Sequence, residues 1–79
     1  MMKETLIANG NGINYYVTDF ENENEPRYGI TEVMENDPTD KNCTDNVFFT
    51  HEEAARRCHW LCENEVYPIS LLDALRNIV

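Results

Sequence analysis

The segment that most constrains the fold runs from Thr50 to Val66, because it is the one long stretch with a helical repeat of apolar residues. Thr50 followed by Glu53 predicts a capping box, in which the hydroxyl accepts a backbone amide and the carboxylate reaches back to the N–H of the cap residue. A helix turns by about 100° per residue, so its small and apolar side chains gather on one side. These side chains belong to Ala54, Ala55, Cys58, Leu61 and Cys62. Small residues permit close approach, so we expect this helix to cover a sheet.

The residues before this helix predict antiparallel strands. Two Asn-Gly pairs at residues 9–12 separate the β-prone runs 5–8 and 13–20, and such pairs favour a hairpin because both residue types tolerate positive φ. We expect a third strand at 27–34, and at 47–49 either a short fourth strand or an extended lead-in to the helix. A turn-rich loop at 35–46 is expected to join them.

The second strand has two different faces. Tyr15 and Val17 share one face, which we expect to meet the helix. The other face is expected to be partly exposed, and it carries Asn14, Tyr16, Thr18 and Phe20. Within the third strand, Gly29 indicates either a bulge or a close approach by another backbone or a ring.

A second helix is expected at residues 69–79, because Pro68 is tolerated in a first helical turn. The chain therefore predicts a single domain of class α+β over residues 1–79. We expect an antiparallel sheet of three to four strands followed by two C-terminal helices packed on one face. A chain of 79 residues buries only somewhat more than ~60% of its unfolded surface, so a homodimer would add stability.

The chain is strongly acidic, with fifteen acidic against six basic residues and a formal charge of −9. Residues 1–50 contribute −7 of this charge and residues 51–79 contribute −2. The charge argues against direct nucleic-acid binding and against anionic membranes, since phosphates are neutralised by Lys and Arg. A basic protein surface suits it as a partner. The simpler interpretation is that the charge keeps a small domain soluble.

The cysteines and histidines raise the question of a metal site. Three cysteines, an odd number, argue against a disulfide framework and favour a reducing compartment. No segment has the length of a signal peptide or a membrane span, so we expect a cytoplasmic protein. Cys58 and Cys62 could share an ion, but His51 lies about 10 Å from Cys58 along the helix, and a structural zinc site needs four ligands. We therefore expect no metal and no cofactor.

Trp60 stands out on the helix, because it lies about 160° around the axis from Cys58, on the side opposite the small residues. Arg56 and Glu53 lie at the margins of this side. Tryptophan and arginine are enriched at binding hot spots, which favours an interface. The alternative is that the C-terminal helix covers Trp60.

A row of acidic residues, Glu21, Glu23 and Glu25, follows Asp19 at alternate positions. In an extended chain their carboxylates would recur every ~6.6 Å and could imitate a phosphate backbone. The alternative is a solvated turn. The candidate interface residues are thus Trp60, Arg56, Glu53, Glu21, Glu23 and Glu25.

No nucleophile has an evident base, and no phosphate-binding loop is present, so we expect no catalytic residues and no enzyme. The function that the sequence favours is a non-enzymatic protein–protein interaction module. One alternative is an acidic inhibitor or nucleic-acid mimic of phage or mobile-element type, directed against a nuclease or a defence system. It would occupy a basic nucleic-acid site and needs the carboxylates of residues 19–45 on one face. The second alternative is a small Cys/His metal-binding protein.

The motifs Tyr15-Tyr16-Val17, Tyr28-Gly29-Ile30 and the segment 66–73 with its Pro-initiated helix resemble an uncharacterised family of small Firmicute proteins. That family is classed as a domain of unknown function, and the likeness spans about residues 13–76. The resemblance implies a small bacterial α+β domain. It assigns no activity and no functional residue.

Overall fold

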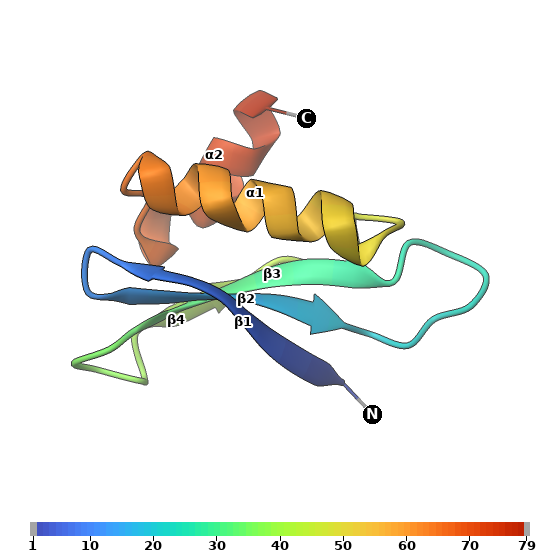
Figure 1. Ribbon diagram of the computed structural model, residues 1–79, viewed down its shortest axis with the longest axis horizontal. Coiled ribbons are helices and arrows are strands. Elements are labelled where there is room, and N and C mark those ends of the chain that lie inside the picture. Colours follow the sequence, from blue (N-terminus) through green and yellow to red (C-terminus); the bar gives the residue numbers. More distant parts are fainter. Residues whose placement is uncertain (1, 79) are drawn as a thin grey trace.

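The computed structural model describes residues 2–78 and forms one sheet covered on one side by helices (Figure 1). The four strands are antiparallel and lie in the order β1-β2-β3-β4. Both helices follow the strands in the chain, which confirms the predicted α+β class. The elements are β1 (Lys3–Gly10), β2 (Ile13–Asp19), β3 (Tyr28–Met34), β4 (Lys41–Cys43), α1 (His51–Glu63), the 3₁₀ turn η1 (Pro68–Ser70) and α2 (Leu71–Ile78).

The β1–β2 hairpin closes where the Asn-Gly pairs predict it. Asn11 and Gly12 both have positive φ, 59° and 74°, which is the backbone that a tight hairpin turn requires. The register then pairs Gly10 with Ile13 and continues to Lys3 opposite Asp19. It shifts once, between Leu6 and Ala8, where β1 has a bulge.

The core lies between the helices and the face of the sheet turned toward them, which we call the covered face. The covered face carries Ile13, Tyr15, Val17, Ile30 and Glu32, all buried. The predicted orientation of Tyr15 and Val17 is therefore confirmed. From the helices, the buried side chains are Ala54, Cys58, Leu61, Leu71 and Leu75. Small residues bring α1 close, as expected: a Cβ added to Gly10 would lie 2.8 Å from the Cys62 sulfur.

Two predicted boundaries are wrong. The expected loop 35–46 contains the fourth strand, Lys41–Cys43. Residues 47–49 form the lead-in to α1, the other predicted alternative, and Phe48 there makes only a single bridge to Tyr28. A tight turn causes β4 to form, because the Asp40 amide donates to the Asp37 carbonyl over 2.9 Å and returns the chain to β3.

The first helix ends at Glu63 instead of Val66. Glu65 adopts a left-handed φ of 53°, and the Val66 amide then donates to the Leu61 carbonyl over 3.0 Å. The Glu65 amide donates to the Cys62 carbonyl over 3.2 Å, which completes a Schellman-type helix end. The second helix begins as η1 at Pro68, and Val79 lies outside the described residues.

Gly29 marks a close approach of neighbouring groups, one of the two predicted outcomes. A Cβ at this position would lie 2.7 Å from the Asp45 carbonyl oxygen, 2.7 Å from the Thr44 hydroxyl and 3.0 Å from the Phe20 ring. The bulge lies in β1 instead. The segment that follows β4 is therefore held tightly against β3.

Candidate protein-binding face

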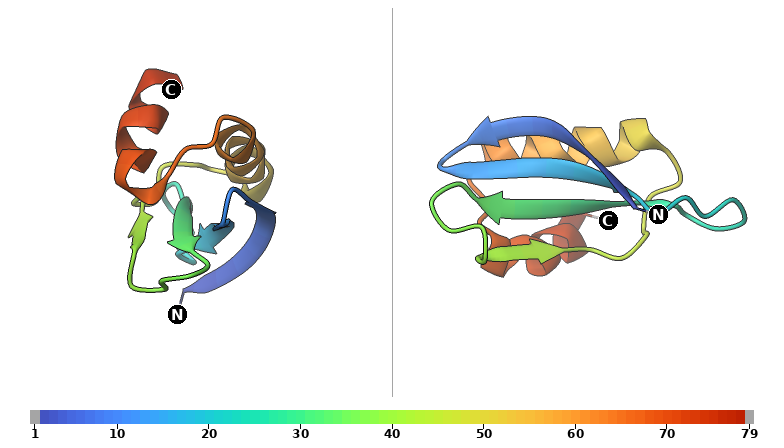
Figure 2. Two further views of the ribbon diagram at one scale, coloured as in Figure 1. Left: turned by 90° about the vertical axis from the view of Figure 1, so that its left-hand side faces the viewer. Right: turned by 90° about the horizontal axis from the view of Figure 1, so that it is seen from below.

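The sheet face turned away from the helices is the candidate site, and we call it the open face. Among residues 2–78 no helix or strand lies over it (Figure 2). The register places Leu6, Tyr16, Thr31 and Cys43 in one row across the four strands. Leu6 is 54% exposed, and Tyr16 is half-buried. Antiparallel sheets usually turn polar side chains to water, so an aliphatic and an aromatic side chain in this row are unexpected.

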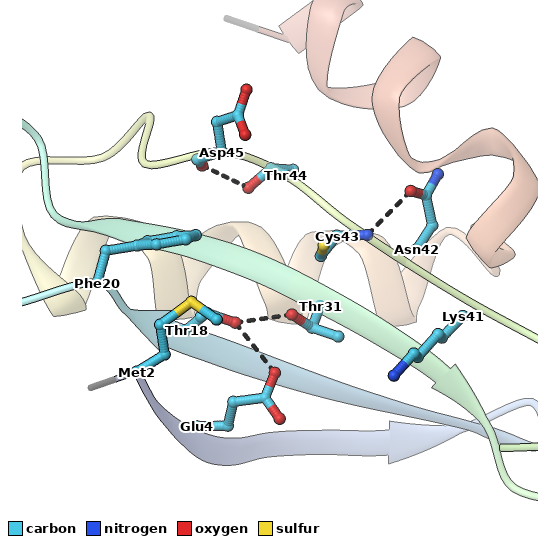
Figure 3. Close-up of a pocket in the computed structure, with 10 residues that line it drawn as sticks. All are labelled: Met2, Glu4, Thr18, Phe20, Thr31, Lys41, Asn42, Cys43, Thr44 and Asp45. Atoms are coloured by element: carbon cyan, nitrogen blue, oxygen red, sulfur yellow. Dashed lines mark hydrogen bonds between the residues drawn. The ribbon is translucent and has the colours of Figure 1, made fainter. Parts of the chain in front are cut away.

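A hollow of about 380 Å³ lies on the open face (Figure 3). Thr18 of β2 and Thr31 of β3 line this hollow. Met2, Phe20 and the segment 41–45 also line it. Met2 is exposed and Phe20 is half-buried. The hollow therefore presents apolar side chains around a threonine pair.

The threonine pair satisfies its own hydrogen bonds. The Thr18 and Thr31 hydroxyls lie 2.7 Å apart, and the Thr18 hydroxyl also donates to the Glu4 carboxylate over 3.3 Å (Figure 3). Thr18 is 4% exposed and Thr31 is 6% exposed, although no helix covers them. Buried hydroxyls that are paired need no further partner, so the contact surface of the hollow is mainly apolar.

Charges around the hollow are mixed, and the large acidic loops lie farther away. Glu4, Asp45 and Lys41 line the hollow. The β2–β3 and β3–β4 connections lie at opposite ends of β3 (Figure 1). Their carboxylates are separated accordingly, with Glu21, Glu23 and Glu25 at one end and Glu35, Asp37 and Asp40 at the other. The carboxylates of residues 19–45 are therefore divided between the two ends of the sheet and do not form one cluster.

The residues after Asp19 form a turn, the second of the two predicted alternatives, and not an extended row of carboxylates. The strand β2 ends at Asp19, and Glu21 has a φ of 57°, so the chain turns instead of continuing extended. Arg27 donates to both Asp19 oxygens, over 2.9 and 3.1 Å, and this guanidinium holds the pKa of Asp19 below its usual range. Lys3 lies 3.6 Å from Glu21. The exposed Glu23 and Glu25 lie in the bend that follows.

The helix side brings together only some of the predicted residues. The Glu53 amide donates to the Thr50 hydroxyl over 3.1 Å, and that hydroxyl lies 3.1 Å from the Glu53 carboxylate. The carboxylate thus reaches the cap side chain instead of its backbone N–H. Arg56 and Glu53 line a hollow of about 130 Å³ together with Phe48. Trp60 is half-buried and packs against the core, and it does not line this hollow.

Glu32 is a residue that the sequence reasoning missed. It is fully buried on the covered face, and neither carboxylate oxygen has a hydrogen-bond partner within residues 2–78. Burial raises the pKa of Glu32 to about 8. The signal was available, because strand alternation places this carboxylate on the same face as Ile30. A charged residue in a row of core positions calls for an explanation.

The groups near Glu32 form no reactive site. Burial raises the pKa of the Tyr15 hydroxyl and of the Cys58 thiol to about 12 each. A thiol with a raised pKa stays protonated at neutral pH and is a poor nucleophile. The Tyr15 hydroxyl donates to the Val66 carbonyl over 3.2 Å, and the Cys58 thiol donates to the Tyr16 carbonyl over 3.6 Å. These groups serve the packing of α1 on β2.

The cysteines and histidines do not converge. Within residues 2–78, no group of three or more His, Cys, Asp or Glu side chains is placed to hold a metal ion. Cys43 is exposed, Cys58 is buried and Cys62 is half-buried, all as free thiols. The His51 ring packs edge-on against Tyr28 with ring centres 5.7 Å apart. In the same part of the chain, no helix combines the length and the apolar character needed to cross a membrane.

No family model, curated protein or solved structure matches this chain. The resemblance to the small Firmicute family stays a prediction.

Proposed function

We propose that this chain is a non-enzymatic protein–protein interaction module, and that it binds a positively charged cytoplasmic protein through the open face. The observation that carries the proposal is the largely apolar hollow on a sheet face that no described helix covers. The Trp60 and Arg56 surface on α1, which the sequence favoured, is the competing interface.

The apolar character of the open face supports binding. Apolar surface left in contact with water gains roughly 25 cal/mol per Å² when a partner covers it. Leu6 and Met2 are both more than half exposed, and Tyr16 and Val33 lie half-buried on the same face. Contiguous apolar surface of this kind marks interaction sites more often than isolated exposed residues do.

The charge of the chain supports a basic partner. The part that forms the sheet, residues 1–50, carries a formal charge of −7, against −2 for residues 51–79. A basic protein would be steered toward the sheet by this field, whereas a second copy of the chain, at −9, would be repelled. We therefore favour a different protein over a homodimer.

The acidic inhibitor or nucleic-acid mimic has less support. A mimic of a phosphate backbone needs regularly spaced charges along one surface. Here the acidic loops lie at opposite ends of the sheet, and Asp19 is neutralised by Arg27.

The test compares two variants that add the same charge to different faces. Leu6→Lys places a cation on the open face, and His59→Lys places one on the exposed surface of α1. Each tagged protein is crosslinked in cells that naturally carry the chain, and the captured proteins are quantified. Arg56→Ala serves as a third variant that probes the competing surface.

We expect the wild type and His59→Lys to capture the same basic protein, and Leu6→Lys to lose it. The complex should weaken as salt is raised, because exposed charges are screened beyond about 10 Å at ~0.1 M salt. If Arg56→Ala loses the captured protein and Leu6→Lys keeps it, the proposal is contradicted and the interface lies on α1. Equal capture by the wild type and all three variants would show that neither the open face nor the α1 surface is the interface.

A further inference from the structure

The outer edge of β4 has backbone groups that no described strand uses. The Thr44 amide donates to the Ile30 carbonyl over 2.9 Å, and the Asp40 carbonyl accepts from the Met34 amide over 3.0 Å. Successive residues of a strand direct their backbone groups to opposite sides. Lys41 and Cys43 therefore direct their amides and carbonyls away from β3, and β4 is the last strand in the sheet order.

Hollows flank this edge on both faces of the sheet. The open-face hollow of about 380 Å³ reaches β4 and includes Lys41 and Cys43. A second hollow, of about 360 Å³, lies on the helix side and is lined by Val47, Leu72 and Leu75 among others. Residues 44–45 line both hollows. A strand added to this edge would direct alternate side chains to the two faces, one set toward each hollow.

The two hollows differ in chemistry. On the helix side, α2 lies behind β4 at the sheet edge (Figure 2), and Leu72 and Val47 are each about half exposed there. These side chains suit aliphatic groups of a partner. On the open face the hollow contains the paired Thr18 and Thr31, and we expect a partner to place short β-branched side chains beside them.

Acidic residues lie at both ends of the β4 edge. Asp37 and Asp40 precede β4, and Asp45 follows it two residues after Cys43. Lys41 is the one cation within residues 37–45. A strand on this edge would therefore meet these three carboxylates against two cations, Lys41 and the Arg76 that lines the helix-side hollow, and the net negative charge favours basic residues in the strand.

The amide of Cys43 is hydrogen-bonded to the side chain of its own neighbour, Asn42. It donates to the Asn42 side-chain oxygen over 2.9 Å (Figure 3). The Asn42 side-chain amide in turn donates to the Pro68 carbonyl over 3.0 Å. A partner carbonyl at Cys43 would take the place of this side-chain oxygen, so the Asn42 side chain has to rotate when the strand is added. The opposite edge is less suited, since β1 carries a bulge between Leu6 and Ala8.

We propose that an extended segment of the partner adds to β4 as a fifth strand, with aliphatic side chains in the helix-side hollow, β-branched side chains in the open-face hollow and basic residues at both ends. The inference rests on the proposed interaction function and specifies how the partner is held. Backbone hydrogen bonds supply affinity in this mode, and the side-chain hollows supply specificity.

The probe is a short fluorescent peptide in which leucine or valine alternates with threonine between two pairs of lysines. Its control has the lysines replaced by glutamates. Cys43→Pro removes the outward amide while the bonds of β4 to β3 remain, and Cys43→Thr is the matched variant that keeps the amide. Leu72→Asp alters the helix-side hollow at a half-exposed position and serves where the proline variant fails to fold.

We expect the lysine peptide to bind the wild type and Cys43→Thr equally, and the glutamate peptide to bind neither. Cys43→Pro and Leu72→Asp should each weaken binding by about tenfold, the effect of one lost hydrogen bond or one lost apolar contact. Equal binding by Cys43→Pro, Leu72→Asp and Cys43→Thr would overturn the strand-addition inference, as would no binding of the lysine peptide to the wild type. The proposed function has its own test, the loss of the captured protein in Leu6→Lys, and survives either result.

Discussion

Buried polar groups on the two faces of the sheet differ in whether they are hydrogen-bonded. On the covered face, Glu32 is fully buried and its carboxylate has no hydrogen-bond partner within the described residues. On the open face, Thr18 and Thr31 are paired over 2.7 Å although no helix lies above them. The covered face is thus closed by apolar packing with one unsatisfied acid. On the open face the buried hydroxyls are hydrogen-bonded to each other, and both apolar and charged side chains surround them.

The covered face therefore determines the stability of the fold, and the open face is the one available to a partner. Side chains on the covered face contact the helices, so their removal costs stability. Leu6 on the open face is half exposed, so its removal costs little in the free protein and affects only a complex. Substitutions of one type should therefore have different effects on the two faces.

The largest effect is expected from Glu32, whose folded pKa of about 8 lies above its ordinary value of 4.5. The folded state then holds the proton more tightly than the unfolded state does. The contribution of Glu32 to the free energy of unfolding is fully present below about pH 4.5. It falls by roughly 1 kcal/mol per pH unit as the pH rises toward 8. Urea unfolding over this range measures the slope.

Glu32→Gln is the control, because it keeps the shape and removes the titration. The other carboxylates are present in both proteins, and the Asp19–Arg27 pair acts in the opposite direction, since its lowered pKa is felt only at lower pH. We expect the variant to be more stable than the wild type at pH 8 and nearly equal to it at pH 4.5. An identical slope in both proteins would contradict the burial of Glu32.

A large loss of stability is expected from Leu61→Ala on α1. This side chain is fully buried against the covered face, and such truncations cost about 2–5 kcal/mol. Leu6→Ala on the open face removes the same atoms from a half-exposed position and should change stability by about 0.5 kcal/mol or less. Thermal unfolding of the two variants compares the faces directly, and similar losses would remove the distinction.

Glycine substitutions test the close contacts on the two sides. Gly29→Ala places a methyl group 2.7 Å from the backbone oxygen of Asp45, which cannot move without displacing the 44–45 segment. We expect a cost of about 1–3 kcal/mol in chemical unfolding. Gly10→Ala meets the Cys62 sulfur at 2.8 Å, and this side chain can rotate, so a smaller cost is expected. A larger cost at Gly10 would show that α1 is held more rigidly than residues 44–45.

The smallest effect concerns the threonine pair. Thr18→Val leaves the Thr31 hydroxyl buried without its partner and should cost about 1 kcal/mol. The double variant with Thr31→Val replaces both hydroxyls by methyl groups of similar shape and should recover most of the loss. A double-mutant cycle by urea unfolding measures the coupling. Additive losses would mean that the hydroxyls are solvated independently.

Local signals in the sequence predicted much of the fold. The Asn-Gly pairs placed the hairpin, Thr50 placed the start of α1, and the alternation of β2 placed Tyr15 and Val17 in the core. Each of these depends on residues close together in the chain. The Gly29 contact was predicted as one of two outcomes, because the sequence alone could not tell which group would approach.

The sequence did not predict features that depend on distant contacts. The strand β4 exists because the chain turns at 37–40 and pairs with β3, and its three residues have no strong β pattern. The helix end at Glu65 uses a left-handed backbone without the glycine that usually marks it. The hollow on the open face depends on where β4 lies, so it could not be placed before that strand was known.

The most direct test of the central claim is an amide NMR titration of the isotopically labelled protein with the lysine-flanked peptide. We expect shifts at the β4 edge and beside the two hollows that flank it, at Thr31, Val33, residues 41–45, Val47 and Leu72. Amides of α1 around Arg56 and Trp60 should remain in place. Shifts centred on α1, with residues 41–45 unchanged, would contradict the account and return the interface to the helix surface.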